Sequence, residues 1–184
     1  MTAPASMLGV VQLLVVQLAA FEAVLLLASG LHKLIRRERT RAVVREFARV
    51  PRHFAPVAVA TVALLELLAS LSLWIPATRA AGGVLAVLIW GGYLALMLRA
   101  IAQGRRDVDC GCTFGAAHRP LGVFQVTRNV TLTGVALLVA AGSAAGATAP
   151  VVASQILAAL VLLALYGALD QVMAMTPPRR GELL

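Results

Sequence analysis

Five long apolar segments, separated by short polar or turn-forming segments, dominate the hydrophobic pattern of the chain. They cover about residues 8–31, 54–75, 80–98, 121–141 and 151–169. Each segment is close to the roughly 20 residues that a helix needs to cross a hydrocarbon core about 30 Å thick. The pattern therefore predicts an all-α protein, a polytopic transmembrane helical bundle of about five spans. Four spans is the alternative, because the fourth segment contains Arg128 and Asn129 and the fifth is rich in alanine.

The composition supports a membrane protein. Hydrophobic residues make up 60% of the 184 residues and charged residues 13%, which is too apolar for an ordinary soluble domain. The first apolar segment is longer than the apolar core of a typical signal peptide and lacks a basic region before it, so we expect a retained helix. No separate soluble domain is visible, and we expect a single integral membrane domain over residues 1–184.

The basic residues are distributed unequally between the two sides of the predicted membrane. The formal net charge of +8 would suggest nucleic acid in a soluble protein, but here the position of the charges predicts topology instead. Fourteen basic residues fall on one side and only Arg79 on the other. We therefore expect a lipid bilayer as partner, no nucleic acid, and an inner (plasma) membrane location with the amino terminus outside and the carboxy terminus cytosolic. The fourteen are Lys33, Arg36, Arg37, Arg39, Arg41, Arg45, Arg49, Arg52, Arg99, Arg105, Arg106, Arg119, Arg179 and Arg180.

The first cytosolic loop has a pattern of its own. Ala42, Val43, Phe47 and Val50 recur at helical spacing among arginines, and Pro51 follows them. This pattern predicts a short amphipathic helix that rests on anionic lipid headgroups and ends at the proline. A protein docking site is the alternative role for this helix.

Short connections and glycines predict close packing of the second and third segments. Only residues 76–79 separate these segments, so we expect a tight helical hairpin. Gly82, Gly83, Gly91 and Gly92 lie in the third segment, where small residues let neighbouring helices approach closely.

The only two cysteines, Cys110 and Cys112, lie one residue apart in a polar segment between the third and fourth apolar segments. Such a pair is typical of a thiol/disulfide couple. Gly111 lets the backbone bend so that the sulfurs can meet, although the ring they close is small and strained. Strained, exposed disulfides exchange readily, so one cysteine would attack a partner and the other would resolve the mixed disulfide.

Two alternatives remain open for the cysteine pair. The cysteines could be inert loop residues, since the nearby Asp107 and Asp109 oppose the thiolate that the flanking basic residues would stabilise. Alternatively, Cys110, Cys112, His118 and Asp109 could hold a metal. We expect no metal, because the chain lacks a second cysteine pair and the spacing matches no common zinc pattern.

Several ionisable residues lie inside the predicted spans. Glu22 and Glu66 both fall near mid-membrane, where a charge costs several kcal/mol unless it is paired, neutral or hydrated. The two carboxylates could be neighbours, and Arg128 could pair with either, with Asn129 as a hydrogen-bonding companion. One interpretation is a polar clasp that holds the bundle together. The other is a proton-linked or quinone-facing site beside the cysteines, because thiol oxidation releases protons; no cofactor is certain, and a quinone is the candidate.

Four blocks of sequence together resemble the MauE family, the methylamine utilisation membrane proteins, which is related to the DoxX-like membrane proteins. The resemblance covers most of the chain in order and spacing, and the cysteine block is its specific part. The family usually reads Cys-Gly-Cys-Phe-Gly, whereas Thr113 intervenes here. The blocks are Ser29-Gly30-Leu31-His32-Lys33-Leu34, Leu65-Glu66-Leu67-Leu68, Asp109-Cys110-Gly111-Cys112 with Phe114-Gly115, and Arg128-Asn129.

The resemblance implies a role in redox maturation. Family members are implicated in maturing the small, disulfide-rich subunit of methylamine dehydrogenase, alongside a thioredoxin-like partner. By resemblance, the protein would be a membrane thiol/disulfide redox component and, as an enzyme, a thiol-disulfide oxidoreductase. Its client would be a secreted protein with disulfides. Cys110 and Cys112 would form the dithiol. The supporting residues would be Glu66, Arg128, Asn129, Glu22 and Lys33.

Other functions and one tension remain. A non-enzymatic membrane assembly factor or scaffold is the main alternative, and a small-molecule or metal transporter is the third. The charge distribution puts the cysteine pair at the cytosolic face, whereas the implied client folds outside the cytosol. Either electrons cross the bilayer from a cytosolic thioredoxin, or the pair is reachable from the far side of the bundle.

Overall fold

The computed structural model describes residues 5–105, 121–142 and 149–175. Within these residues the chain is helical, with no strand. They form five long helices and the short α2, and a 3₁₀ turn connects α3 to α4. The elements are α1 (Ala5–Ile35), α2 (Arg37–Phe47), α3 (Ala55–Trp74), η1 (Pro76–Thr78), α4 (Arg79–Ala102), α5 (Val123–Gly142) and α6 (Ala149–Met175).

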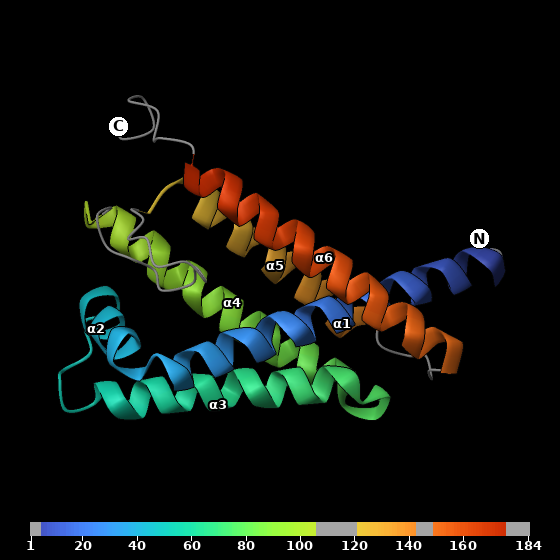
Figure 1. Cartoon of the computed structure of the whole chain (residues 1–184), viewed down its shortest axis with the longest axis horizontal. Helices are drawn as coiled ribbons and strands as arrows, with labels where there is room; N and C mark the ends of the chain where they lie inside the picture. Colours follow the sequence, from blue (N-terminus) through green and yellow to red (C-terminus); the bar gives the residue numbers. More distant parts are fainter. Residues whose placement is uncertain (1–4, 106–120, 143–148, 176–184) are drawn as a thin grey trace.

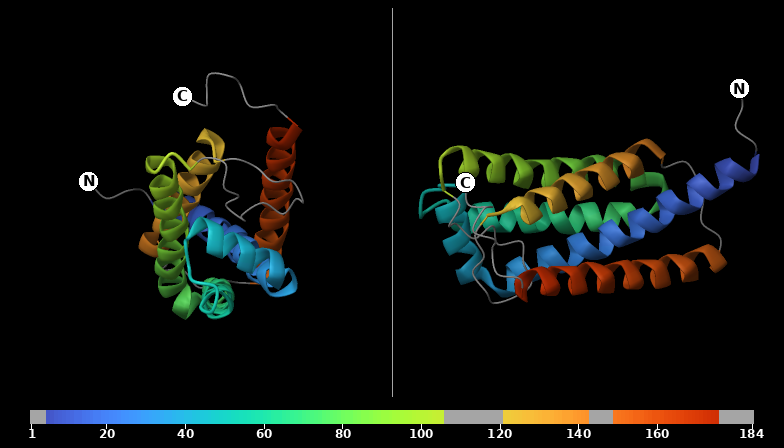
Figure 2. Two further views of the ribbon diagram at one scale, coloured as in Figure 1. Left: turned by 90° about the vertical axis from the view of Figure 1, so that its left-hand side faces the viewer. Right: turned by 90° about the horizontal axis from the view of Figure 1, so that it is seen from above.

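The five long helices lie lengthwise beside one another, and α2 folds back across one end of the bundle (Figures 1 and 2). We call this the α2 end; α1, α4 and α6 finish there, and α3 and α5 begin there. The opposite, η1 end carries the turn between α3 and α4. The turn confirms the predicted hairpin. α1 is central, because it packs against α3, α5 and α6.

The outer surface of the bundle is apolar. Leu64, Leu88 and Leu165 are each more than half exposed, at 56%, 66% and 62%. A backbone in hydrocarbon must satisfy its own hydrogen bonds, so helices with leucine-rich outer faces are the expected solution for a membrane chain. Among the described residues, four helices are long and apolar enough to span a membrane, and Ala153–Leu169 within α6 forms a shorter apolar helix. The predicted all-α, polytopic bundle is confirmed.

Two of the four glycines expected to aid packing do so. A Cβ atom on Gly82 would lie 2.9 Å from the backbone nitrogen of Leu73, and one on Gly83 would lie 2.7 Å from that of Ala140. These two glycines therefore bring α4 close to α3 and α5. The prediction was wrong for Gly91 and Gly92, since a Cβ on either would meet nothing within 4 Å. Helix rotation turns them away from the neighbouring helices.

The predicted amphipathic helix is present as α2, but its apolar face packs on the bundle. Phe47 is buried in a cluster with Met97, Ala100 and Leu121, and Val43 packs against it. The expectation that this face rests on lipid headgroups is corrected for Phe47, because α4 and the residues before α5 offer a protein surface. The Arg105 guanidinium also donates to the Glu46 carbonyl, which joins α2 to the end of α4.

Arg79, the only basic residue expected on the far side of the membrane, has a structural position at the η1 end. Its side chain is buried, and Nε donates to the carbonyl of Leu73, 3.2 Å away. The bond satisfies a carbonyl in the last turn of α3, a group that a helix end leaves without an intrahelical partner. This arginine therefore closes the α3–α4 hairpin.

Candidate functional site

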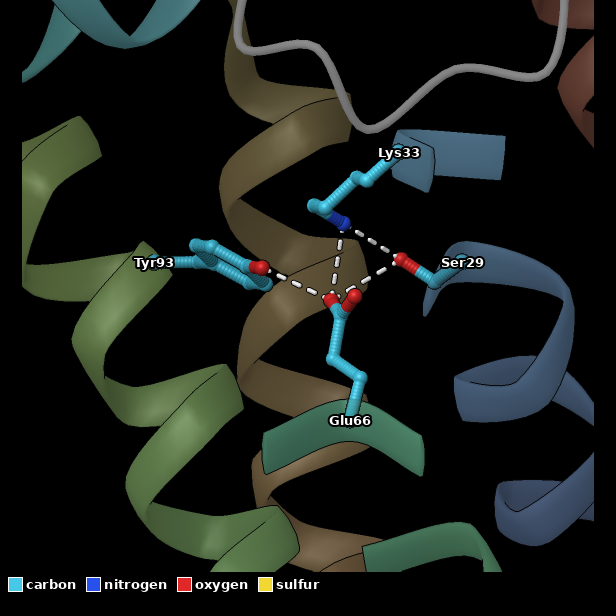
Figure 3. Close-up of polar contacts among 4 residues, drawn as sticks. All are labelled: Ser29, Lys33, Glu66 and Tyr93. Carbon is cyan, nitrogen blue, oxygen red and sulfur yellow. Dashed lines mark hydrogen bonds and ion pairs between the residues drawn. The ribbon is translucent and has the colours of Figure 1, made fainter. Parts of the chain in front are cut away.

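A buried carboxylate on α3 is the centre of the most extensive polar cluster among the described residues (Figure 3). Glu66 has no exposed surface. Its Oε1 accepts hydrogen bonds from Lys33 Nζ at 2.8 Å, Ser29 Oγ at 2.9 Å and Tyr93 OH at 2.7 Å. Lys33 Nζ also donates to Ser29 Oγ at 2.7 Å. Helices α1, α3 and α4 therefore meet at one oxygen atom.

The local sequence explains why these groups converge. Ser29 and Lys33 are four residues apart on α1, so they share one helix face. Between them, Gly30 allows α3 to come close, because a Cβ there would lie 3.1 Å from the Leu67 side chain. The missing side chain brings the two donors within reach of Glu66.

Glu66 and Lys33 form an ion pair that is almost shielded from solvent. The Lys33 side chain is 11% exposed and Glu66 is fully buried. Desolvating two charges is expensive, and only close geometry with additional hydrogen bonds offsets that cost. Ser29 and Tyr93 supply those bonds, and the Lys33 ammonium also lies 5.4 Å from the Tyr93 ring centroid, within cation–π range. The cluster can hold a fixed ammonium and phenol at the α2 end.

Glu22, on α1, has a sparser environment. Its Oε2 accepts a hydrogen bond from Trp90 Nε1 at 2.7 Å, and the residue has no exposed surface. Trp90 and Tyr93 are three residues apart on α4, with ring centroids 5.9 Å apart. The two buried carboxylates are therefore linked indirectly, through two aromatic residues of α4.

The expected pairing of Arg128 with Glu22 or Glu66 is corrected. The ion-pair partner of Glu66 is Lys33, and the guanidinium carbon of Arg128 lies 6.0 Å from the Tyr166 ring centroid. Asn129 also differs from the expected companion role, because its Nδ2 donates to the Gln125 carbonyl at 3.1 Å and approaches Met97 Sδ at 3.6 Å. Both residues are buried. From α5, Arg128 contacts Tyr166 of α6 and Asn129 contacts Met97 of α4.

Three members of the two carboxylate sites were not predicted as site residues: Ser29, Trp90 and Tyr93. The spacing of Ser29 and Lys33 by four residues was a visible signal that both share a helix face. The presence of Trp90 and Tyr93 in an otherwise aliphatic segment was another, since buried indole and phenol groups require hydrogen-bond partners.

Cys110 and Cys112 lie outside the described residues. The described residues on either side of their segment, Arg105 and Leu121, are both at the α2 end. Lys33 is close to the same end of α1, two residues before the helix finishes. The chain segment with both cysteines is therefore attached at the end of the bundle where Lys33 lies.

Comparison with known proteins identifies the family. The family model described as methylamine utilisation protein MauE matches residues 10–142. The methylamine utilization protein MauE of Paracoccus denitrificans is 34% identical over 132 residues, 68% of this chain and 67% of that protein. The protein of the same name from Paracoccus versutus is 31% identical over 152 residues, 81% of each chain. No solved structure matches. The matched residues include most of α1 and all of α2 to α5, and thus both buried carboxylates, and the chain belongs to the MauE family.

Proposed function

We propose that this protein is a membrane thiol/disulfide redox component of methylamine utilisation, with Cys110 and Cys112 as its dithiol. Its relatives carry methylamine utilisation in their names. The observation that carries the redox proposal is the single Cys-Gly-Cys pair in a segment whose two flanks lie at the α2 end. A dithiol at a membrane surface is accessible to a protein partner, and the arginines of α2 supply positive potential that favours a thiolate.

In the proposed reaction, electrons and protons are exchanged only between the protein and its partner. One thiolate attacks a disulfide of a thioredoxin-like protein and forms a mixed disulfide, with one partner sulfur leaving as a thiolate. The second cysteine then attacks, and the pair becomes a disulfide while the partner becomes a dithiol. Two electrons and two protons pass to the partner, and the reverse sequence reduces the pair. The client would be a secreted protein with disulfides, by resemblance the small subunit of methylamine dehydrogenase.

The proposal places the α2 end in the cytosol and the protein in the plasma membrane. The basic residues of α2 and of the end of α4 favour this orientation. Reporter fusions after Arg52 and after Arg180 should both give cytosolic signals. A periplasmic signal from the fusion after Arg180 would mean that the number of spans is even.

A membrane assembly factor without redox activity is the second candidate. The observation that favours it is the Glu66 cluster itself, in which three donors from two helices converge on one oxygen of a third. Such a cluster fixes α1, α3 and α4 relative to one another, a role that needs no redox activity.

Thiol labelling separates the two candidates. Alkylation and mass spectrometry of the purified full chain should show two labelled thiols after mild reduction and none after mild oxidation. In cells, Cys110→Ser with Cys112→Ser should abolish client maturation, whereas the control Thr113→Ser in the same segment should leave it intact. Full maturation with the double serine variant would refute the redox proposal and support the assembly factor.

A further inference from the structure

A cavity of about 200 Å³ lies beneath α2, between that helix and the adjoining faces of α3 and α4. We call it the α2 cavity. Its lining includes Lys33, Val43, Phe47, Ala58, Val62 and Tyr93. Two members of the Glu66 cluster, the lysine and the tyrosine, therefore also border a space that another molecule can enter.

The lining selects a neutral, largely apolar occupant. Apart from Lys33, Thr40 and Tyr93, every lining residue is aliphatic or aromatic. Arg45 of α2 and Arg49, which follows this helix, border other hollows, and no arginine among the described residues lines this cavity. The only ammonium available to a phosphate in this cavity would be that of Lys33, which already pairs with Glu66. The apolar lining would also penalise the charge of the phosphate.

The same lining offers a hydrogen bond to an oxygen acceptor. An ammonium has three N–H donors, and the described residues Ser29 and Glu66 accept two from Lys33. One N–H group of a lysine whose position is fixed by two bonds therefore remains for a ligand. The bond would favour a carbonyl oxygen, which accepts without carrying charge into the cavity.

The volume limits the size of the bound group. Ligand pockets for drug-sized molecules are typically about 300–1,000 Å³, so the α2 cavity is smaller. It is nevertheless several times the roughly 30 Å³ that a water molecule occupies in the liquid. A single substituted ring fits this range, and Phe47 and Tyr93 provide aromatic surfaces for it. Any longer apolar chain on the ligand would have to extend into the lipid.

We propose that the α2 cavity binds the headgroup of a membrane quinone, with one quinone carbonyl accepting a hydrogen bond from Lys33 Nζ. A quinone combines a flat neutral ring, a carbonyl acceptor and a lipid-soluble tail. The redox consequence rests on the proposed function. A dithiol that closes to a disulfide releases two electrons and two protons, and a quinone that accepts them becomes a quinol. Binding itself does not require the cysteines.

Tryptophan fluorescence tests the binding directly. Trp90 lies beside Tyr93, at 5.9 Å between ring centroids, so a quinone in the cavity should quench it. Trp74→Phe removes the other tryptophan, at the far end of α3. Titration of this purified full chain with decylubiquinone should give saturable quenching. Ala58→Phe, which fills the cavity, should weaken the apparent affinity at least tenfold.

A matched control distinguishes the cavity from general partitioning into detergent. Ala60→Phe introduces the same side chain at an exposed position two residues along α3, and it should leave the titration unchanged. Lys33→Met should also weaken binding if that variant folds; Ala58→Phe keeps the test decisive if it does not. Non-saturable quenching, or equal titrations for Ala58→Phe and Ala60→Phe, would overturn the proposal. Displacement of the quinone by equimolar phosphatidylglycerol would overturn it in favour of a phospholipid site.

The double serine variant separates this inference from the proposed function. Quenching should persist with Cys110→Ser and Cys112→Ser, because the cavity is formed by other residues. If the unsubstituted dithiol is not oxidised although the quinone binds, the redox function fails while the binding site stands. If the dithiol exchanges with thioredoxin but no quinone binds, only the cavity proposal fails.

Discussion

Glu66 and Glu22 are both carboxylates without exposed surface in adjacent helices, but their surroundings differ. Glu66 accepts hydrogen bonds from an ammonium, a serine hydroxyl and a phenol. Glu22 accepts only one, from an indole. Each carboxylate also has one buried oxygen without a hydrogen-bond partner among the described residues, Oε1 of Glu22 and Oε2 of Glu66. A buried acidic residue in a membrane bundle can thus be one half of an ion pair or a lone acceptor. The two arrangements predict different responses to mutation.

Removal of the cation should have the largest effect. Lys33→Met leaves Glu66 buried without its ion-pair partner, and breaking a buried pair from one side typically costs about 3–5 kcal/mol of unfolding free energy. We expect a large fall in folded yield and in the thermal midpoint, measured by size-exclusion chromatography of heated, detergent-solubilised protein.

A double-mutant cycle provides the control for this pair. Lys33→Gln with Glu66→Gln should recover part of the loss, because neither charge is then left alone. The cycle of Arg128→Gln with Glu66→Gln should instead be additive within about 0.5 kcal/mol. Strong coupling in the second cycle and none in the first would contradict the observed pairing and restore the clasp expected from sequence.

Removal of one donor from each carboxylate should give a smaller, unequal effect. Trp90→Phe deprives Glu22 of its indole donor, and an unsatisfied buried group costs about 1–3 kcal/mol. Tyr93→Phe should cost about 1 kcal/mol, since Lys33 and Ser29 still donate to Glu66. Thermal midpoints of both variants test the order, with Trp74→Phe as the control for loss of an indole. A greater loss for Tyr93→Phe than for Trp90→Phe would reverse the comparison.

Neutralisation of Glu22 should have the smallest effect. Glu22→Gln keeps an oxygen that can accept from Trp90 and removes a charge that has no ion-pair partner among the described residues. We expect a change in unfolding free energy within about 1 kcal/mol. Glu22→Leu, which removes the acceptor as well, should destabilise more. A collapse of folded yield with Glu22→Gln alone would show that the negative charge itself is needed.

Hydropathy was sufficient to predict most of the fold. The helices begin and end within a few residues of the predicted segments over α3, α4 and α5, and the α3–α4 hairpin lies at the predicted turn. These features follow from bilayer thickness and from the need to satisfy backbone hydrogen bonds, both of which act on one segment at a time. The role of Gly91 and Gly92 was predicted wrongly, because a glycine's neighbours depend on how the helix is rotated.

The candidate site shows where prediction from sequence stops. The sequence alone identified Glu22, Glu66, Arg128 and Asn129, because polar groups in apolar segments stand out and require an explanation, whereas Lys33 was named through the family resemblance. The Cys110–Cys112 pair was also visible in the sequence, because its proposed chemistry depends on the local spacing of the two cysteines. Only the tertiary structure decided which groups meet. Lys33 rather than Arg128 reaches Glu66, because Gly30 brings α1 close to α3 while α5 directs Arg128 toward Tyr166. From the sequence, several basic residues could pair with the same carboxylate equally well. The choice among them depends on helix rotation and separation, which arise from packing across the whole bundle.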